Sequence, residues 1–235
     1  DVERQVAAGA DMLDVNAGVP LADEAGLLAR MVRLVQEHTD LPLCLDSSVV
    51  EALEAGLAVY RGKALVNSVT GEDDRLAEVL PLVKRYGAAV IALANDETGI
   101  PETVEKRLEI TDKIVRVATR EYGIPLEDIV IDPLAMTVGA DADAVTVTLE
   151  TIREIRRRYG LNMCLGASNV SFGLPDRATI NAAFLAMAMS AGLTSAIMNA
   201  LAPECVAAVR AGDLLLGNDP WGANWIAAYR AKAAS

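Results

Sequence analysis

The sequence predicts an α/β fold built on a parallel sheet, and two observations carry this prediction. Short apolar runs alternate with amphipathic stretches along the 235 residues, as strands and crossover helices do in a parallel sheet. Hydrophobic residues make up 52% of the chain and aromatic residues 4%, which suits helices packed on parallel strands better than an aromatic-rich antiparallel sandwich. No linker or composition shift divides the chain, so residues 1–235 are expected to form one domain.

Seven short apolar runs are predicted as strands. In chain order they are residues 11–17 (DMLDVNA), 41–47 (LPLCLDS), 64–69 (ALVNSV), 88–94 (AAVIALA), 128–134 (DIVIDPL), 162–168 (NMCLGAS) and 195–201 (SAIMNAL). The stretches between them are predicted as helices because their apolar residues recur at intervals of three and four. Clear examples are residues 21–39 and 103–123, and residues 2–10 (VERQVAAGA) read as the end of another helix.

This alternation fits both an open doubly wound sheet and a closed (β/α)8 TIM barrel. No GxGxxG follows the first strand, and polar residues recur at the ends of almost all strands. The barrel is favoured because its active site lies at that carboxyl-terminal rim. Seven strands are one too few for closure, which would leave two unpaired edges. We therefore expect either that the chain begins after strand one of a longer parent sequence or that something else covers the gap.

Charge and cysteine content narrow the class of protein. The formal net charge of -12 argues against a nucleic-acid or anionic-membrane partner, since neither surface attracts an acidic protein. The longest basic run, residues 156–158, reads as the end of a helix. No apolar run reaches the length of a membrane span and no signal peptide opens the chain, so a cytoplasmic location is expected. The three cysteines have no CxxC spacing and are predicted to fill the core in a reducing compartment: Cys44, Cys164 and Cys205.

Carboxylates and amides gather at the predicted strand ends, where few of the usual catalytic residue types occur. The only histidine, His38, falls late in a predicted helix, so no Ser/His/Asp triad or histidine general acid can be built at the rim. The rim residues are Asp14, Asn16, Asp46, Asn67, Asn95, Asp132, Ser168 and Asn169.

These rim residues suit a flat heterocycle better than a metal ion. Hard cations prefer oxygen ligands, but half of the set are amides and no DxD or HxH spacing is present, so no metal site is predicted. A carboxylate accepts two adjacent N–H groups while an amide matches a neighbouring carbonyl and ring nitrogen, which together complement an amino-pyrimidinone edge such as that of a pterin. Capping of βα loops is the alternative for any single residue, and it weakens because six strand ends agree.

Residues 166–177 (GASNVSFGLPDR) and 180–200 (INAAFLAMAMSAGLTSAIMNA) carry a family resemblance, together with LCLDSS, LVNSV and VIDPL. The chain resembles the pterin-binding methyltransferases that move a methyl group between methyltetrahydrofolate and a corrinoid protein. That family includes the methyltetrahydrofolate:corrinoid/iron-sulfur protein methyltransferase and the folate domain of cobalamin-dependent methionine synthase. Both remain open, because FGLP is like the methionine synthase side and the short chain is like the corrinoid/iron-sulfur side.

The resemblance implies roles for individual residues of a barrel of the dihydropteroate-synthase-like type. Asn169 is expected to reach N5, the nitrogen that carries the methyl group, and Asp46 is the candidate carboxyl for a proton relay. Asp14 and Asn16 match a DxNxG strand at the pocket floor. The resemblance also implies that Asp46, Asn67 and Asp132 bind the pyrimidine edge of the pterin, that Gly166 and Ser168 line the pocket, and that Arg177 lies beside it.

The resemblance also implies the partners of the chain and leaves two alternatives. Folate is the expected substrate, the corrinoid (cobalamin) is carried by a partner protein, and a homodimer is expected. Dihydropteroate synthases share the barrel and the pterin pocket, but they follow strand six with DPGxGFxK and strand seven with SRK, where this chain reads DPLAMTVGAD and GASNVS without lysine. A folate-binding module without turnover is the other alternative, suggested by the absent counterpart of the family's first strand, which ends in Glu-Arg-x-Asn.

Overall fold

Seven parallel strands form the centre of the molecule in the computed structural model, which describes residues 1–18 and 23–234. The strands pair in chain order from β1 to β7. All seven runs predicted as strands contain one, with shorter bounds. These bounds are β1 Leu13–Asn16, β2 Leu43–Asp46, β3 Leu65–Val69, β4 Ala89–Leu93, β5 Ile129–Asp132, β6 Asn162–Gly166 and β7 Ser195–Ile197.

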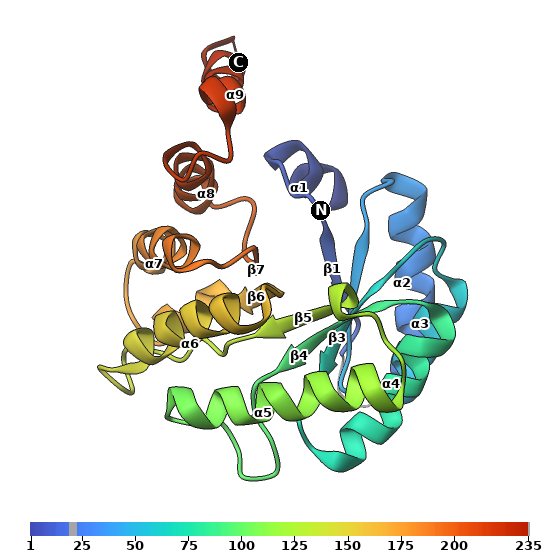
Figure 1. Ribbon diagram of the computed structural model, residues 1–235. Coiled ribbons are helices and arrows are strands. Elements are labelled where there is room, and N and C mark those ends of the chain that lie inside the picture. Colours follow the sequence, from blue (N-terminus) through green and yellow to red (C-terminus); the bar gives the residue numbers. More distant parts are fainter. Residues whose placement is uncertain (19–22, 235) are drawn as a thin grey trace.

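Helices connect the strands and surround the sheet (Figure 1). Their bounds are α1 Val2–Ala8, α2 Glu24–His38, α3 Val50–Val59, α4 Asp73–Tyr86, α5 Val104–Arg116, α6 Ala144–Tyr159, α7 Arg177–Ala191, α8 Pro203–Leu215 and α9 Ala223–Ala234. Short helical turns cover Val117–Glu121 (η1), Leu126–Asp128 (η2), Ala167–Ser171 (η3) and Pro220–Gly222 (η4). Of the helix predicted over residues 21–39, residues 21 and 22 lie outside the described residues.

The seven strands curve into a nearly closed barrel. The pairing runs from β1 to β7, and among the described residues no strand joins these two edge strands. Figure 1 shows α2 and α3 on one side of the barrel and α7 and α8 on the other, with α9 projecting away from it. The predicted α/β barrel is confirmed, and seven strands stand where a closed TIM barrel has eight.

Apolar side chains fill both faces of the sheet. Because successive residues of a strand point to opposite faces, Leu43 and Leu45 pack outward against the helices while Cys44 points into the barrel. Inside, the buried Cys44, Ile91 and Cys164 form a cluster separate from the outer core. Leu65, Val130 and Ile197 pack against this cluster. We call these six residues the barrel plug, since they fill the barrel below the carboxyl ends of its strands.

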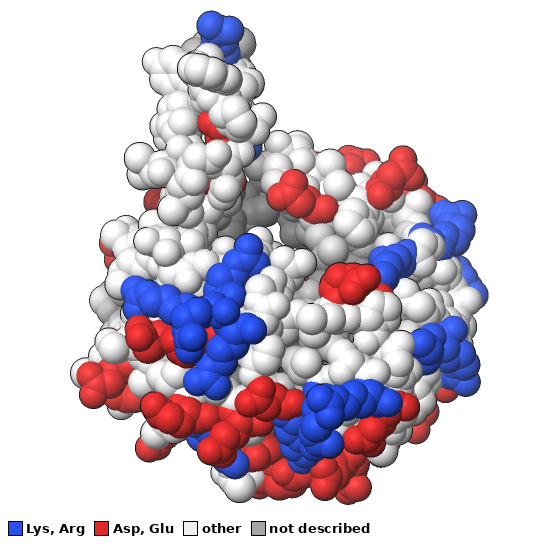
Figure 2. Space-filling view, viewed as in Figure 1, with Lys and Arg blue, Asp and Glu red and all other residues white. Residues whose placement is uncertain are grey.

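The surface carries intermixed charges over the helices and few charges on the projecting α8–α9 segment (Figure 2). His38 is the last residue of α2, which agrees with its predicted place late in a helix. Its Nδ1 lies 3.6 Å from Glu3 Oε1. At the end of α6, Arg157 pairs with Glu154 at 2.7 Å. Within residues 1–18 and 23–234, no helix combines the length and the apolar character that crossing a membrane requires.

Candidate functional site

Three predicted site residues lie side by side at the carboxyl ends of neighbouring strands. Asn16 at the end of β1 is in register with Asp46 at the end of β2, and Asp46 is in register with Asn67 of β3. Parallel strands in register carry their side chains on the same face. The local sequence patterns DVN, CLD and LVN therefore set a row of amide, carboxylate and amide along one rim of the barrel.

Direct hydrogen bonds order this row. Asn16 Nδ2 donates to Asp46 Oδ2 at 2.8 Å, and Asn16 Oδ1 accepts the Gly18 amide at 2.8 Å. The main chain of Asn67 is also held, because its carbonyl accepts the Ser47 amide at 3.0 Å. Asn16 thus occupies one oxygen of Asp46 and leaves the carboxylate able to accept further N–H groups.

Asp14 adds a second carboxylate behind this row. It is in register with Cys44 of the barrel plug. Burial by the barrel wall raises the pKa of Asp14 above its ordinary value, and the nearby charge of Asp46 raises it further, while hydrogen bonds with Cys44 and Asn67 act in the opposite direction. Two carboxylates, Asp14 and Asp46, therefore lie close enough to influence each other at this end of the barrel.

Asp132 is the last residue of β5. It lies farther round the carboxyl-terminal opening of the barrel, which we call the mouth. Pro133 follows it directly and ends the strand, because proline has no N–H to continue the ladder. Asp132 Oδ1 accepts the Leu134 amide at 2.8 Å. Burial raises the pKa of Asp132 to about 7, although the Leu134 hydrogen bond and the cation of Arg107 both lower it. A carboxyl of this kind can exist in either protonation state near neutral pH.

The loop after β6 presents Asn169 next to Gly166. Residues 167–171 form η3, so the predicted strand to Ser168 ends earlier, at Gly166. The side chain of Asn169 lies against Gly166, where an added Cβ would meet Asn169 Nδ2 at 3.2 Å. Ser168 is half-buried and Asn169 is exposed. Glycine at position 166 thus leaves room for an amide that faces solvent at the mouth.

Arg177, the first residue of α7, fastens this loop. Its Nη2 donates to the Ser168 carbonyl at 2.7 Å and its Nε donates to Ser171 Oγ at 3.0 Å. The Ser171 hydroxyl in turn donates to Asn181 Oδ1 at 2.7 Å, and the guanidinium lies 5.8 Å from the centre of the Phe172 ring. These contacts hold the Ser168–Ser171 segment against the start of α7, and a role of Arg177 in binding a ligand stays a prediction.

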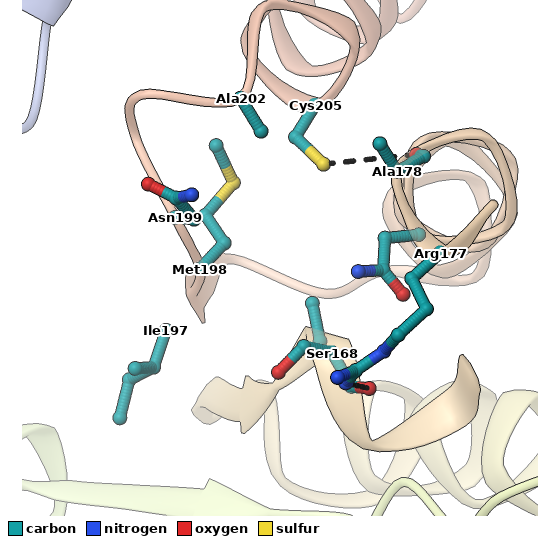
Figure 3. Close-up of a pocket in the computed structure, with 10 residues that line it drawn as sticks. Ser168, Arg177, Ala178, Ile197, Met198, Asn199, Ala202 and Cys205 are labelled. Carbon is teal, nitrogen blue, oxygen red and sulfur yellow. Dashed lines mark hydrogen bonds between the residues drawn. The ribbon is translucent and has the colours of Figure 1, made fainter. Parts of the chain in front are cut away.

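A cavity of about 350 Å³ opens between η3, α7, the end of β7 and α8 (Figure 3). Ser168 and Arg177 line it, but Asp46, Asn67 and Asp132 do not. The predicted residues therefore fall into two groups, one around the mouth at β1–β5 and one beside β6 and β7. The other residues lining the cavity are Ala167, Ala178, Asn181, Ile197, Met198, Asn199, Ala202 and Cys205.

Asn199 lines this cavity and was not among the residues predicted for the site. The predicted strand ran to residue 201, whereas β7 ends at Ile197 and Asn199 follows in a turn. Its Oδ1 accepts the Leu201 amide at 2.9 Å. The pattern that singled out the other rim residues, a polar side chain just after an apolar strand, is also present in AIMN. Applied to the seventh strand, the same rule would have found Asn199.

Asn95, at the rim after β4, has a side-chain oxygen without a hydrogen-bond partner among the described residues. This Oδ1 is buried, and the same holds for Thr70 Oγ1 after β3, which also has no partner in the part of the chain that the structure describes. The loops that carry them are joined through the main chain, since the Gly71 amide donates to the Asn95 carbonyl at 2.8 Å.

The donors and acceptors of the mouth suit a neutral heterocycle with N–H and C=O groups along one edge. In the part of the chain that the structure describes, no three His, Cys, Asp or Glu side chains are grouped as a metal ion would require. The carboxylates of Asp46 and Asp132 accept N–H groups, while the amide of Asn67 can both donate and accept.

Comparison with known proteins decides the family. Residues 1–199 match the family described as pterin binding enzyme. This chain is a member of the pterin-binding enzyme family. It is 36% identical over 218 residues to the methylcorrinoid:tetrahydrofolate methyltransferase of Eubacterium limosum, covering 92% of this chain and 80% of that protein. It is also 34% identical over 204 residues to the methionine synthase of Mycobacterium tuberculosis, covering 82% of this chain and 17% of that protein.

Solved structures agree with this pterin-binding fold. Dihydropteroate synthase of Yersinia pestis, in complex with a pterin-sulfa conjugate, superposes with a TM-score of 0.74 at 14% identity, over 92% of this chain and 86% of that one. The Xanthomonas albilineans enzyme with 7,8-dihydropteroate gives a TM-score of 0.72 at 18% identity, over 91% and 82%. At these identities the likeness concerns the barrel alone. The resemblance to pterin-binding methyltransferases that the sequence motifs suggested is confirmed by the two relatives.

Proposed function

We propose that this chain transfers the N5-methyl group between methyltetrahydrofolate and the cobalt of a corrinoid protein. The observation that carries the proposal is the row of Asn16, Asp46 and Asn67 at the rim, together with the Asn169 amide over Gly166. Its similarity to a methylcorrinoid:tetrahydrofolate methyltransferase and to a methionine synthase supports the same reaction.

The rim residues bind the pterin ring edge in this proposal. Asp132 and Asp46 accept N–H groups of the amino-pyrimidinone, and Asn67 pairs with the adjacent carbonyl and ring nitrogen. Asp14 and Asn16 complete the floor, and Asn16 keeps the Asp46 carboxylate oriented through its 2.8 Å hydrogen bond. Gly166, Ser168 and Arg177 form the wall on the side of β6. The ring is thereby held flat with N5 turned toward the open mouth.

Asn169 acts on the leaving nitrogen. In the displacement the bond between N5 and the methyl carbon breaks, its electron pair returns to N5, and the methyl carbon forms its new bond to the acceptor. A neutral tertiary amine leaves poorly until its lone pair takes a proton or a strong hydrogen bond. Asn169 donates that hydrogen bond, but an amide has no accessible proton to give, so the proton arrives through water or a carboxylic acid. Asp46 is the proposed carboxyl for this relay.

The alternatives have less support. A synthase of the dihydropteroate type must stabilise a departing pyrophosphate, which needs cations. The segments DPLAMTVGAD and GASNVS contain no lysine, and the nearby cation of Arg177 is engaged by the Ser168 carbonyl and Ser171 Oγ. A folate-binding module without turnover would use the same pocket, and only an assay of transfer separates it from the enzyme.

The proposal includes the assembly expected from the resemblance. Two copies of the chain form a homodimer in the cytoplasm, and a corrinoid protein, rather than nucleic acid or a membrane, is the macromolecular partner. Light scattering after gel filtration measures the mass of the particle directly. A monomer at the concentrations used in assays would remove the homodimer from the proposal without affecting the reaction.

An anaerobic spectroscopic assay tests the reaction. Cob(I)alamin is mixed with methyltetrahydrofolate with and without the chain, and the absorbance spectrum is followed as methylcobalamin forms. We expect methylcobalamin to form only when the protein is present, and to form more slowly with an Asn169→Ala variant. Binding of folate without any conversion would support the non-catalytic module instead, and absence of both binding and conversion would refute the proposal.

A further inference from the structure

Arg107 is a buried cation on α5 that the proposed mechanism does not use. It is 2% exposed and forms no ion pair with the carboxylates of the described residues, so its charge is balanced by no direct partner. Burying a guanidinium costs free energy unless its N–H groups are all engaged. Burial accordingly lowers the pKa of Arg107, although the charge of Asp132 acts in the opposite direction. The hydrogen bonds of the Arg107 side chain offset this cost.

The guanidinium of Arg107 fastens two rim loops to each other. Its Nε donates to the Pro101 carbonyl at 3.0 Å, in the loop after β4. Its Nη1 donates to the carbonyls of Pro133 at 2.7 Å and Leu134 at 2.8 Å, in the loop after β5. Only arginine among the side chains offers N–H groups in a rigid plane that spans several carbonyls at once.

The turn that Arg107 holds carries the Asp132 carboxylate. Leu134 has a φ of 65°, a left-handed conformation that costs a leucine free energy and persists only where surrounding contacts impose it. The Leu134 carbonyl is held by Arg107 and also by Thr148 Oγ1 at 2.8 Å, while its amide donates to Asp132 Oδ1 at 2.8 Å. The direction of the Asp132 carboxylate therefore depends on a peptide unit whose position Arg107 maintains.

We propose that Arg107 is a positioning residue for pterin binding, which orients the Asp132 carboxylate through the Pro133–Leu134 turn. This inference rests on the proposed function and deepens it, because it assigns the geometry of one pterin contact to a residue that touches no substrate. Arg107 acts on affinity in this account. Asp132 meets the ring edge equally in the ground state and during transfer, so loss of its orientation raises KM and leaves kcat nearly unchanged.

The test compares Arg107→Met and Arg107→Lys with Arg116→Met, a matched control on the same helix whose arginine makes an exposed ion pair with Glu121. Tetrahydrofolate affinity is measured by calorimetry on folded, monodisperse protein, and kcat and KM by the methylcobalamin assay. Loss of charge-assisted hydrogen bonds should raise the Kd and the KM of Arg107→Met by about tenfold or more. Arg107→Lys, which keeps the charge but not the planar fork, should recover part of that loss. The control should match the wild type.

A double-mutant cycle separates positioning from general structural support. In an Asp132→Ala background Arg107 has no carboxylate to orient, so adding Arg107→Met should change the Kd by less than about twofold. Effects of the two substitutions that multiply, or a folded Arg107→Met variant with wild-type affinity, would overturn the proposal. Where Arg107→Met does not fold, Thr148→Val and Arg107→Lys answer the same question, and wild-type affinity in both overturns it equally. Failure of the wild type to bind folate removes the proposed function and this inference together, whereas wild-type transfer with unaffected Arg107 variants removes only the inference.

Discussion

The Asn16 side chain donates a 2.8 Å hydrogen bond to Asp46 Oδ2 across the carboxyl ends of β1 and β2. This contact joins the edge strand of the barrel to the central carboxylate of the proposed pterin site. Its loss would free Asp46 to adopt other rotamers, and binding would then have to order the side chain again.

Replacing Asn16 should therefore weaken folate binding without unfolding the protein. Asn16→Ala is expected to raise the Kd for tetrahydrofolate about fivefold, as loss of one hydrogen bond of about 1 kcal/mol predicts. Asn162→Ala, at the exposed opposite end of β6, is the control. Equal affinities of the two variants in a calorimetric titration would contradict the role given to Asn16.

Asn169 should affect the rate of methyl transfer more than the stability of the fold. Because it is exposed, Asn169→Ala should leave the melting temperature nearly unchanged. It should weaken methyltetrahydrofolate binding and slow transfer by roughly a hundredfold, the effect of losing one transition-state hydrogen bond worth about 3 kcal/mol. Single-turnover rates of methylcobalamin formation measure this, with Asn218→Ala on the turn after α8 as control. Unchanged kinetics would remove Asn169 from the mechanism.

Gly166 should be sensitive to the addition of one methyl group. The Cβ of an alanine would lie 3.2 Å from Asn169 Nδ2, which forces the amide to move, while the backbone φ of -73° at Gly166 suits any residue. Gly166→Ala should slow transfer by about tenfold through displacement of Asn169. Gly139→Ala is the matched control, since its Cβ would have no contact shorter than 3.4 Å. Similar rates for the two variants would argue against a close fit at Gly166.

The raised pKa of Asp132 predicts that folate affinity depends on pH. The carboxyl has a pKa of about 7, so the form that accepts two N–H groups is depleted below that pH in the free protein. The Kd for tetrahydrofolate should rise by about tenfold for each pH unit below about 7. Titrations at several pH values measure this, and Asp132→Asn corrects for ionisation of the ligand. Parallel profiles of the two proteins would show that Asp132 is not the group responsible.

The same carboxyl should lower the stability of the protein at neutral pH. Its pKa is raised in the folded state above the ordinary value of 3.8, so the stability it contributes is complete below about pH 3.8 and is lost as the pH rises through about 7. Asp132→Asn should therefore raise the melting temperature above pH 7, and the gain should shrink toward pH 4. Circular dichroism at both ends of this range measures the difference. A variant less stable than the wild type at pH 8 would reverse the assigned sign.

The strands and the rim residues could be predicted because local sequence determines them. Runs such as LPLCLDS combine consecutive buried apolar residues with a polar end, and this pattern locates both β2 and Asp46. The strand bounds were less accurate, since Pro133 ends β5 and a helical turn replaces the last residues expected in β6. These breaks depend on hydrogen bonds made by the loops, which apolar periodicity does not contain.

The contacts that orient the site could not be predicted. Arg107 lies on the buried face of α5, three and seven residues before Ile110 and Ile114, but arginine is a residue type ordinarily found at the surface. Its burial follows from the path of the loops after β4 and β5, which the sequence of α5 does not encode. The pairing of Asn16 with Asp46 likewise depends on the register between two strands 30 residues apart. The types of the site residues are thus local information, and their orientation is not.

Two cysteines of the barrel plug can be used to measure local opening of the barrel. Its two thiols, Cys44 and Cys164, are free and buried, and burial raises the pKa of Cys164 to about 11. A thiol reagent attacks the thiolate, so labelling of either residue must wait for a local opening of the sheet. The labelling rate, measured by mass spectrometry, would report how often the barrel wall opens in the unmodified chain. A ligand bound above the barrel plug should lower this labelling rate.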